Sequence, residues 1–409
     1  MNYVITFGIE FVIMVISVLL FKIVKVKFED VGFAEFSINK RLVGFMAPLM
    51  MMGMGVSLPK FLPNEDDKGQ LEIHYSALMI VTLLFVFSLL LFTLLSGLFS
   101  KLVFGDYQHR TLFGAALLYV YSLMCHACLY NFFRGKFKFG ISSLIQLVNL
   151  GLLPLLTYFV ATSMLNYFLI LSISTLVFLS LINFFFIPIR FFPIQRYVLT
   201  IKRMVSYGVQ RMPGDVLLGL FLAIPTFIAS NYFTLSVGGT IAFSLSLFNI
   251  VIALMSPVNI ILLPKASKMV HEKNYVLLRS ISYQLLFASI GIGVAVMLVV
   301  AFLGQFILQL FNVNNIAEAS VLLKIIFAGI IGFSVFSVIR SIIDAYYDRA
   351  RVTSIIVLAF LFFLLSLGLL AALHLFTIQN VLVVFVISIN MLGLLTFLSL
   401  VSILKSIRP

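Results

Sequence analysis

The chain has 409 residues, of which 62% are hydrophobic and only 10% are charged. This composition excludes a soluble globular domain and indicates an all-α protein that crosses a membrane many times. Lys and Arg exceed Asp and Glu by 27 to 14, a net charge of +13. In a membrane protein such an excess is typical of cationic loops against an anionic leaflet, so we expect no nucleic acid partner.

Apolar runs of about 20 residues recur along the whole chain and predict about twelve transmembrane helices. The first run, Val4–Phe21, has no basic start and no small-residue cleavage site, and we expect it to be a retained helix, not a signal peptide. The expected spans are 4–24, 41–60, 76–100, 111–133, 141–162, 165–189, 212–233, 240–263, 281–306, 321–344, 353–374 and 380–404.

The connections between these spans are too short to hold a folded domain outside the membrane. The longest are Lys22–Arg41, Phe191–Val205 and Lys265–Ser280. A soluble catalytic module is therefore excluded, and we do not expect an enzyme. Most Lys and Arg residues fall on one side of the membrane if both termini are cytoplasmic, so the distribution of charge predicts that orientation.

The two halves of the chain repeat a pattern. Val31–Lys60 and Val237–Lys265 share the order Val-Gly, Phe-Ser, an apolar run with an inner Pro, and Leu-Pro-Lys. We therefore expect two six-helix lobes, residues 1–190 and 206–409, joined by a cytoplasmic linker at 191–205. Two halves with the same topology are typical of transporters that hold their substrate between lobes and expose it to each side in turn.

Two groups of charged residues lie where apolar side chains dominate. Arg211 and Asp215 stand four residues apart at the start of the seventh span, and Arg340, Asp344 and Asp348 repeat the same spacing in the tenth. Charged side chains are costly in lipid, so these residues are expected to face protein or water.

The first half of the chain has further polar candidates. Glu10 is an acid inside the first span and is the candidate for binding a coupling ion, H⁺ or Na⁺; the alternative is a side chain that reaches the membrane surface. Lys40 and Arg41 open the second span, and Arg134 lies at the cytoplasmic mouth of the fourth. His126, between Cys125 and Cys128, is a packing residue or a proton relay.

We expect no metal site and no cofactor. Cys125 and Cys128 are the only cysteines of the chain and have no second Cys/His pair to complete a ligand set. Gly53, Gly55, Gly219 and Gly332 are expected to permit close approach of helices.

Three segments resemble a known family. They are the Gly-rich segment that ends in Leu-Pro-Lys, FFRGKFK (Phe132–Lys138), and RMPGD (Arg211–Asp215). Together with the topology, they resemble the polysaccharide flippases, often called O-antigen flippases, of the multidrug/oligosaccharidyl-lipid/polysaccharide exporter superfamily. The resemblance extends over roughly residues 20–408.

This resemblance implies twelve helices in two pseudo-symmetric lobes around a central cavity. It also implies movement of an undecaprenyl-pyrophosphate-linked oligosaccharide across the inner membrane for the biosynthesis of O-antigen or lipopolysaccharide. The expected partners are that lipid-linked oligosaccharide, membrane lipids, and a polysaccharide polymerase or assembly proteins. Because Arg binds phosphate oxygens in pairs, cationic side chains are the candidate headgroup contacts. The candidate substrate-binding residues are Arg211, Asp215, Arg340, Arg134 and Arg41.

Two other functions stay open at this point. An ion-coupled exporter of drugs or metabolites from the same superfamily would have an acidic cluster in one lobe, for which Glu10 is a single candidate. A membrane polymerase or ligase would have a sizeable outer loop with Arg and His, whereas the expected outer loops are short. No Gly-rich nucleotide-binding motif occurs, so direct drive by ATP is not expected.

Overall fold

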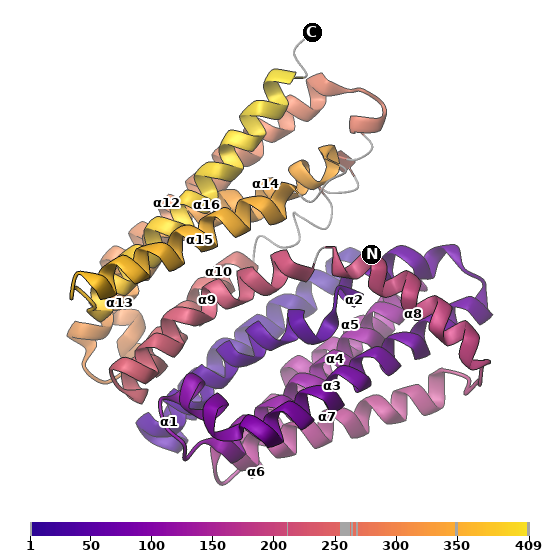
Figure 1. Ribbon diagram of the computed structural model, residues 1–409, viewed down its shortest axis with the longest axis horizontal. Helices are drawn as coiled ribbons and strands as arrows, with labels where there is room; N and C mark the ends of the chain where they lie inside the picture. Colours follow the sequence, from indigo (N-terminus) through magenta and orange to yellow (C-terminus); the bar gives the residue numbers. More distant parts are fainter. Residues whose placement is uncertain are drawn as a thin grey trace. The chain divides into compact units, whose positions relative to one another are not determined.

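A computed structural model describes residues 2–210, 212–253, 262, 265–266, 269–347 and 351–406, apart from the side chains of residues 2–7, 56, 59–60 and 64. Within these ranges the chain is almost entirely helical and contains no β-strand (Figure 1). Ten of the described helices are long and apolar enough to cross a membrane. The expected all-α fold of a multi-pass membrane protein is therefore confirmed.

The chain forms two compact units. Unit 1 holds residues 1–219 and 226–239, and unit 2 holds residues 220–225 and 240–409. The helices of unit 1 are α1 (Asn2–Met51), α2 (Met54–Phe61), the 3-10 turn η1 (Leu62–Asn64), α3 (Asp67–Phe104), α4 (Arg110–Gly135), α5 (Phe139–Gln146), the π-helical turn η2 (Leu147–Leu152), α6 (Leu153–Val160), α7 (Met164–Phe186), α8 (Ile194–Val209) and most of α9 (Met212–Tyr232).

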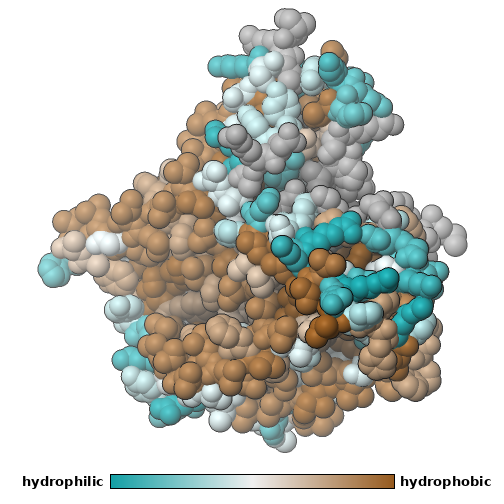
Figure 2. Space-filling model, turned by 45° about the vertical axis from the view of Figure 1, so that its right-hand side comes forward, coloured by the Kyte–Doolittle hydropathy of each residue, from teal (hydrophilic) through white to brown (hydrophobic). Residues whose placement is uncertain are grey.

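Unit 2 contains most of the remaining helices. They are α10 (Leu235–Ala253), whose first residues belong to unit 1, α12 (Tyr275–Leu310), α13 (Ile316–Phe327), α14 (Ile330–Tyr346), α15 (Arg351–Ala372) and α16 (Ile378–Ser406). Apart from α8, the helices from α3 onward correspond to the predicted spans, although α3 begins at Asp67, before the expected residue 76. Their exposed Leu, Phe and Val side chains give the large hydrophobic areas that Figure 2 shows, as expected of surfaces that face lipid.

The first expected span lies in the first part of α1, and the second is divided between the end of α1 and α2, which follow each other after a turn at Met52 and Gly53. α1 continues through the segment 22–41, which was predicted as a loop. That segment contains no Pro, and its residues support helix on both sides of one break. The break is at Glu29, whose backbone is left-handed with φ 57° and ψ −156°. α1 is therefore two helices joined at a kink, and the residues of the connection on both sides of Glu29 are helical.

The segment predicted as a cytoplasmic linker is also helical. α8 begins after Pro193 and packs against unit 1, of which it is a part. Ser57 of α2 donates a hydrogen bond to the carbonyl of Met204 over 3.1 Å. The guanidinium of Arg203 contacts Glu65 at 2.7 Å. Apolar and cationic residues alternate along 191–205 with helical spacing, which explains why a helix forms there.

Glycines allow the closest helix contacts in each unit. In unit 1, Gly53 has φ +74°, which glycine adopts without strain, and its backbone lies against Gly208 of α8. In unit 2, Gly332 of α14 lies against Gly393 of α16, where an added Cβ on Gly393 would lie 2.5 Å from the Cα of Gly332. The expected close approach is confirmed for Gly53, Gly332 and also Gly219. It is wrong for Gly55, because its Cβ position has only the Met51 side chain near it, at 3.9 Å.

Candidate functional site

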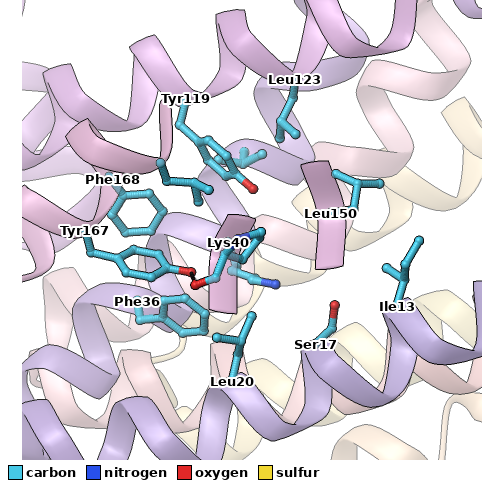
Figure 3. A pocket seen from close by; sticks show the side chains of 13 residues that line it. Ile13, Ser17, Leu20, Phe36, Lys40, Tyr119, Leu123, Leu150, Tyr167 and Phe168 are labelled. Carbon is cyan, nitrogen blue, oxygen red and sulfur yellow. Dashed lines mark hydrogen bonds between the residues drawn. The ribbon is translucent and has the colours of Figure 1, made fainter. Parts of the chain in front are cut away.

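A cavity of about 230 Å³ lies inside unit 1 (Figure 3). Residues of α1, α4, η2, α6 and α7 line it, so the whole site belongs to one compact unit. An engineered cavity of about 150 Å³ is enough to bind benzene. The space in unit 1 can therefore hold a small organic molecule.

Aromatic rings form one wall of this cavity. Tyr167 meets Phe36 with ring centroids 5.7 Å apart and Phe168 at 5.3 Å. Tyr119 completes the wall, 5.7 Å from Phe168. The Tyr167 hydroxyl donates to the backbone carbonyl of Pro154 over 3.3 Å, which fixes the orientation of that ring. Most other lining residues are Leu, Ile and Val, so the walls are mainly apolar.

Three polar groups point into the cavity, the amine of Lys40 and the hydroxyls of Ser17 and Tyr119 (Figure 3). Tyr119 is only 8% exposed. Among the described residues, none of the three groups has a hydrogen-bond or ion-pair partner, and no Asp or Glu lines the cavity. The amine of Lys40 lies 5.4 Å from the ring of Phe36 and 5.6 Å from that of Phe21, within the range of cation–π attraction.

A π-helical turn that packs against α1 forms part of the cavity wall. Pro154 has no N–H to donate to the preceding turn, and the helix widens into η2 just before it. Within η2, Leu150 lines the cavity, and Asn149 donates to Nδ1 of His126 over 3.0 Å. His126 is thus a packed side chain with a defined partner, and the hydrogen bond places the ring proton of the neutral form on Nε2.

Glu10 of α1 lies close to the cavity. Its carboxylate accepts a hydrogen bond of 2.7 Å from Gln146 of α5. Ile13, one turn after Glu10, and Leu150, one turn after Gln146, both line the cavity. The exposed Glu10 therefore sits about one helical turn from the site.

The expected substrate-binding residues lie in several places. Arg41 is 7% exposed in α1, and half-buried Arg134 lies with its guanidinium 6.0 Å from the ring of Tyr130. In unit 2, half-buried Arg340 lies 5.8 Å from the ring of Phe336. Asp215 is half-buried in α9 and Asp344 is exposed in α14. Arg211 and Asp348 lie outside the described residues.

Sequence reasoning did not identify the cavity. Ser17 and Tyr119 were not candidates, and Lys40 was expected, together with Arg41, to receive an anionic headgroup at the outer opening of the second span. The spacing of Phe36, Lys40 and Val43 places one cation on an otherwise apolar helical face, and this was the available signal.

Outside the membrane-spanning helices, His109 connects two parts of unit 1. Its Nε2 lies 3.1 Å from Glu35 of α1, and its Nδ1 lies 2.7 Å from Asp106 in the connection between α3 and α4. The hydrogen bond with Glu35, helped by Asp106, raises the pKa of His109 above its ordinary 6.5, although burial opposes this. Burial also acts against ionisation of Asp106, but hydrogen bonds from His109 and the Gln108 amide leave its pKa below 3.8.

No protein-family model and no curated protein sequence matches this chain. Solved structures do resemble it over nearly its whole length. An inward-facing multidrug resistance MATE family transporter of the MOP superfamily has a TM-score of 0.75 at 11% identity, with 99% of this chain and 98% of that one covered. The MATE multidrug transporter DinF-BH has a TM-score of 0.72 at 14% identity, with coverage of 97% and 95%.

A flippase is also among these structures. The lipid II flippase MurJ, in an inward closed conformation, has a TM-score of 0.70 at 13% identity, with 99% of this chain and 89% of that chain covered. At such low identity the likeness establishes the fold and not the substrate. The chain therefore has the fold of the MOP-superfamily transporters.

Proposed function

We propose that this chain is a flippase that moves an undecaprenyl-pyrophosphate-linked oligosaccharide across the inner membrane by alternating access, with both termini in the cytoplasm. The observation that carries the proposal is the whole-chain likeness to the lipid II flippase MurJ, joined to the sequence resemblance to polysaccharide flippases. Lipid II, named for that neighbour, is a lipid-linked substrate, and such substrates require a polar path through the membrane for the headgroup.

The proposed headgroup contacts are the cationic residues Arg211, Arg340, Arg134 and Arg41, with Asp215 restraining Arg211. Arg binds two phosphate oxygens with one planar group, which Lys does not. A charge-assisted contact of this kind contributes roughly 1.5–3 kcal/mol, or about one to two decades of affinity. Arg211→Ala should lower transport accordingly, and Arg211→Lys should restore part of it.

Proteoliposomes test the substrate directly. A lipid-linked oligosaccharide with a fluorescent sugar is placed in both leaflets, and a membrane-impermeant reductant is added outside. We expect the inner-leaflet label to become reducible only in vesicles that contain the protein. Reduction equal to that in protein-free vesicles, with the protein shown to be inserted, would contradict the flippase function.

The second candidate function is ion-coupled export of drugs or metabolites, which the likeness to MATE multidrug transporters favours. The same vesicles, loaded with a fluorescent organic cation and energised by a gradient of H⁺ or Na⁺, distinguish the two. Cation efflux without lipid flipping would establish the exporter. Glu10 is the proposed ion-coupling residue in either case, so Glu10→Gln should remove the response of transport to the ion gradient.

A further inference from the structure

We propose that the cavity in unit 1 is a binding site for a small organic carboxylate, a monoanion with an apolar body. The lining of this cavity contains none of the proposed headgroup contacts. The proposal does not depend on the flippase function, because it rests on the groups that point into this one cavity.

The polar groups of the cavity select for negative charge. The Lys40 ammonium offers donors only, and the Ser17 and Tyr119 hydroxyls can both donate. All three point inward without a hydrogen-bond partner among the described residues, and no carboxylate of the lining balances Lys40 (Figure 3). A polar group left without a partner in an apolar place is costly, and a ligand carboxylate would satisfy all three groups at once.

The walls and the size of the cavity restrict the rest of the ligand. One ammonium group balances one negative charge, and the apolar lining has few groups to replace the hydration of a multiply charged ion. The aromatic wall of Phe36, Tyr167 and Phe168 suits a flat or apolar body. The volume of about 230 Å³ exceeds that of a benzene site of about 150 Å³ by about 80 Å³, which leaves room for a polar group on an aromatic ring.

Three ligands of similar size and different charge test whether the site recognises charge or shape. Benzoate is the anionic probe, benzamide is its neutral counterpart, and benzylammonium is the cationic one. The purified chain contains no Trp, so Leu123→Trp places a single fluorescent reporter in the cavity lining without background. Thermal unfolding of the wild-type chain with each ligand provides a second measurement that needs no reporter.

We expect benzoate to bind at least about tenfold more tightly than benzamide, and benzylammonium not to bind. Lys40→Met keeps a similar apolar stem, and in that variant benzoate should lose this advantage while benzamide is unaffected. Lys101→Met is the matched control, since the Lys101 amine also lies over a ring, 5.5 Å from Tyr107, but outside the cavity. It should leave benzoate binding unchanged.

Several results would overturn the proposal. Equal binding of benzoate and benzamide, or benzoate binding that survives Lys40→Met, would show that Lys40 does not select for charge. Stabilisation by chloride equal to that by benzoate would show that the apolar body does not contribute. If Lys40→Met does not fold, Ser17→Ala and Tyr119→Phe in the wild-type background must each weaken benzoate binding severalfold. If both bind normally, the proposal is wrong.

Discussion

Replacing Gly208 by alanine should destabilise unit 1, whereas the same replacement at Gly44 should not. Gly208 lies near the end of α8, where an added Cβ would overlap the carbonyl oxygen of Met52 and come within 3.1 Å of the Cα of Gly53. These neighbours are backbone atoms and cannot rotate away. Gly44 is exposed in the middle of the α1 segment after Glu29, and no atom of the described residues lies within 4 Å of its Cβ position.

The size of the effect follows from two opposing contributions. Alanine favours a helix over glycine by about 1 kcal/mol at an interior position. Overpacking of a close contact costs typically about 1–3 kcal/mol, and the upper part of that range applies where backbone is the obstacle. We therefore expect Gly208→Ala to lose about 1–2 kcal/mol and Gly44→Ala to gain up to about 1 kcal/mol. For a unit of this size the difference is roughly 2–12 °C in Tm.

The two cysteines supply the assay. Cys125 and Cys128 are the only thiols of the chain, both are buried in α4 of unit 1, and a maleimide dye reacts with them only when this unit opens. Dye fluorescence against temperature then gives the Tm of unit 1 in each variant. Equal Tm values for Gly208→Ala and Gly44→Ala would refute the reasoning, because they would show that α8 does not rest on the turn between α1 and α2.

Three further predictions follow from unit 1. Contacts with Glu35 and Asp106 raise the pKa of His109 in the folded protein. The stabilisation of the folded state by these contacts is therefore complete below pH 6.5 and is lost as pH rises through the higher folded-state pKa. The Tm difference between wild type and His109→Gln should therefore shrink from pH 6 to pH 8, and a constant difference would contradict this cause. Arg134→Ala should lower lipid flipping by about one decade without lowering the Tm, if Arg134 contacts phosphate. Glu10→Gln should raise benzoate affinity severalfold at low salt and not at about 1 M salt, because it removes a negative charge about one helical turn from the cavity, and salt screens that charge.

The sequence predicted the structure wherever the conformation of a segment depends on that segment alone. Apolar runs of sufficient length predicted the helices from α3 onward, since a segment such as Met164–Phe186 has no stable alternative to a helix in lipid. The same reasoning failed at 22–41 and 191–205. Charged residues there indicated loops, but the charges are spaced to leave an apolar helical face, and a partner surface decides whether that face is buried.

The cavity could not be predicted because several segments must meet to form it. Ser17, Lys40, Tyr119 and Tyr167 come from three helices, and their convergence depends on the break at Glu29, which folds the two parts of α1 about the same space. The π-helical turn before Pro154 also contributes, and a Pro inside an apolar run indicates a disturbance without specifying its form. Which residues form a helix depends on the local sequence, whereas the rotation of a helix about its axis depends on packing against its neighbours.

Lys40 differs from the paired cations of unit 1 in what surrounds it. Lys136 pairs with Asp67 at 2.7 Å, Arg203 pairs with Glu65 at the same distance, and Lys27 donates to the carbonyl of Tyr158 over 2.7 Å. Among the described residues, the Lys40 amine has only aromatic rings as partners. Cation–π attraction offsets only part of the free energy that is needed to remove an ammonium group from water. A Met at this position would fill the space at no such cost. A residue that lowers stability and gains no compensating contact within the protein is expected at a functional site. The position of Lys40 is therefore best explained by a ligand that supplies the missing negative charge.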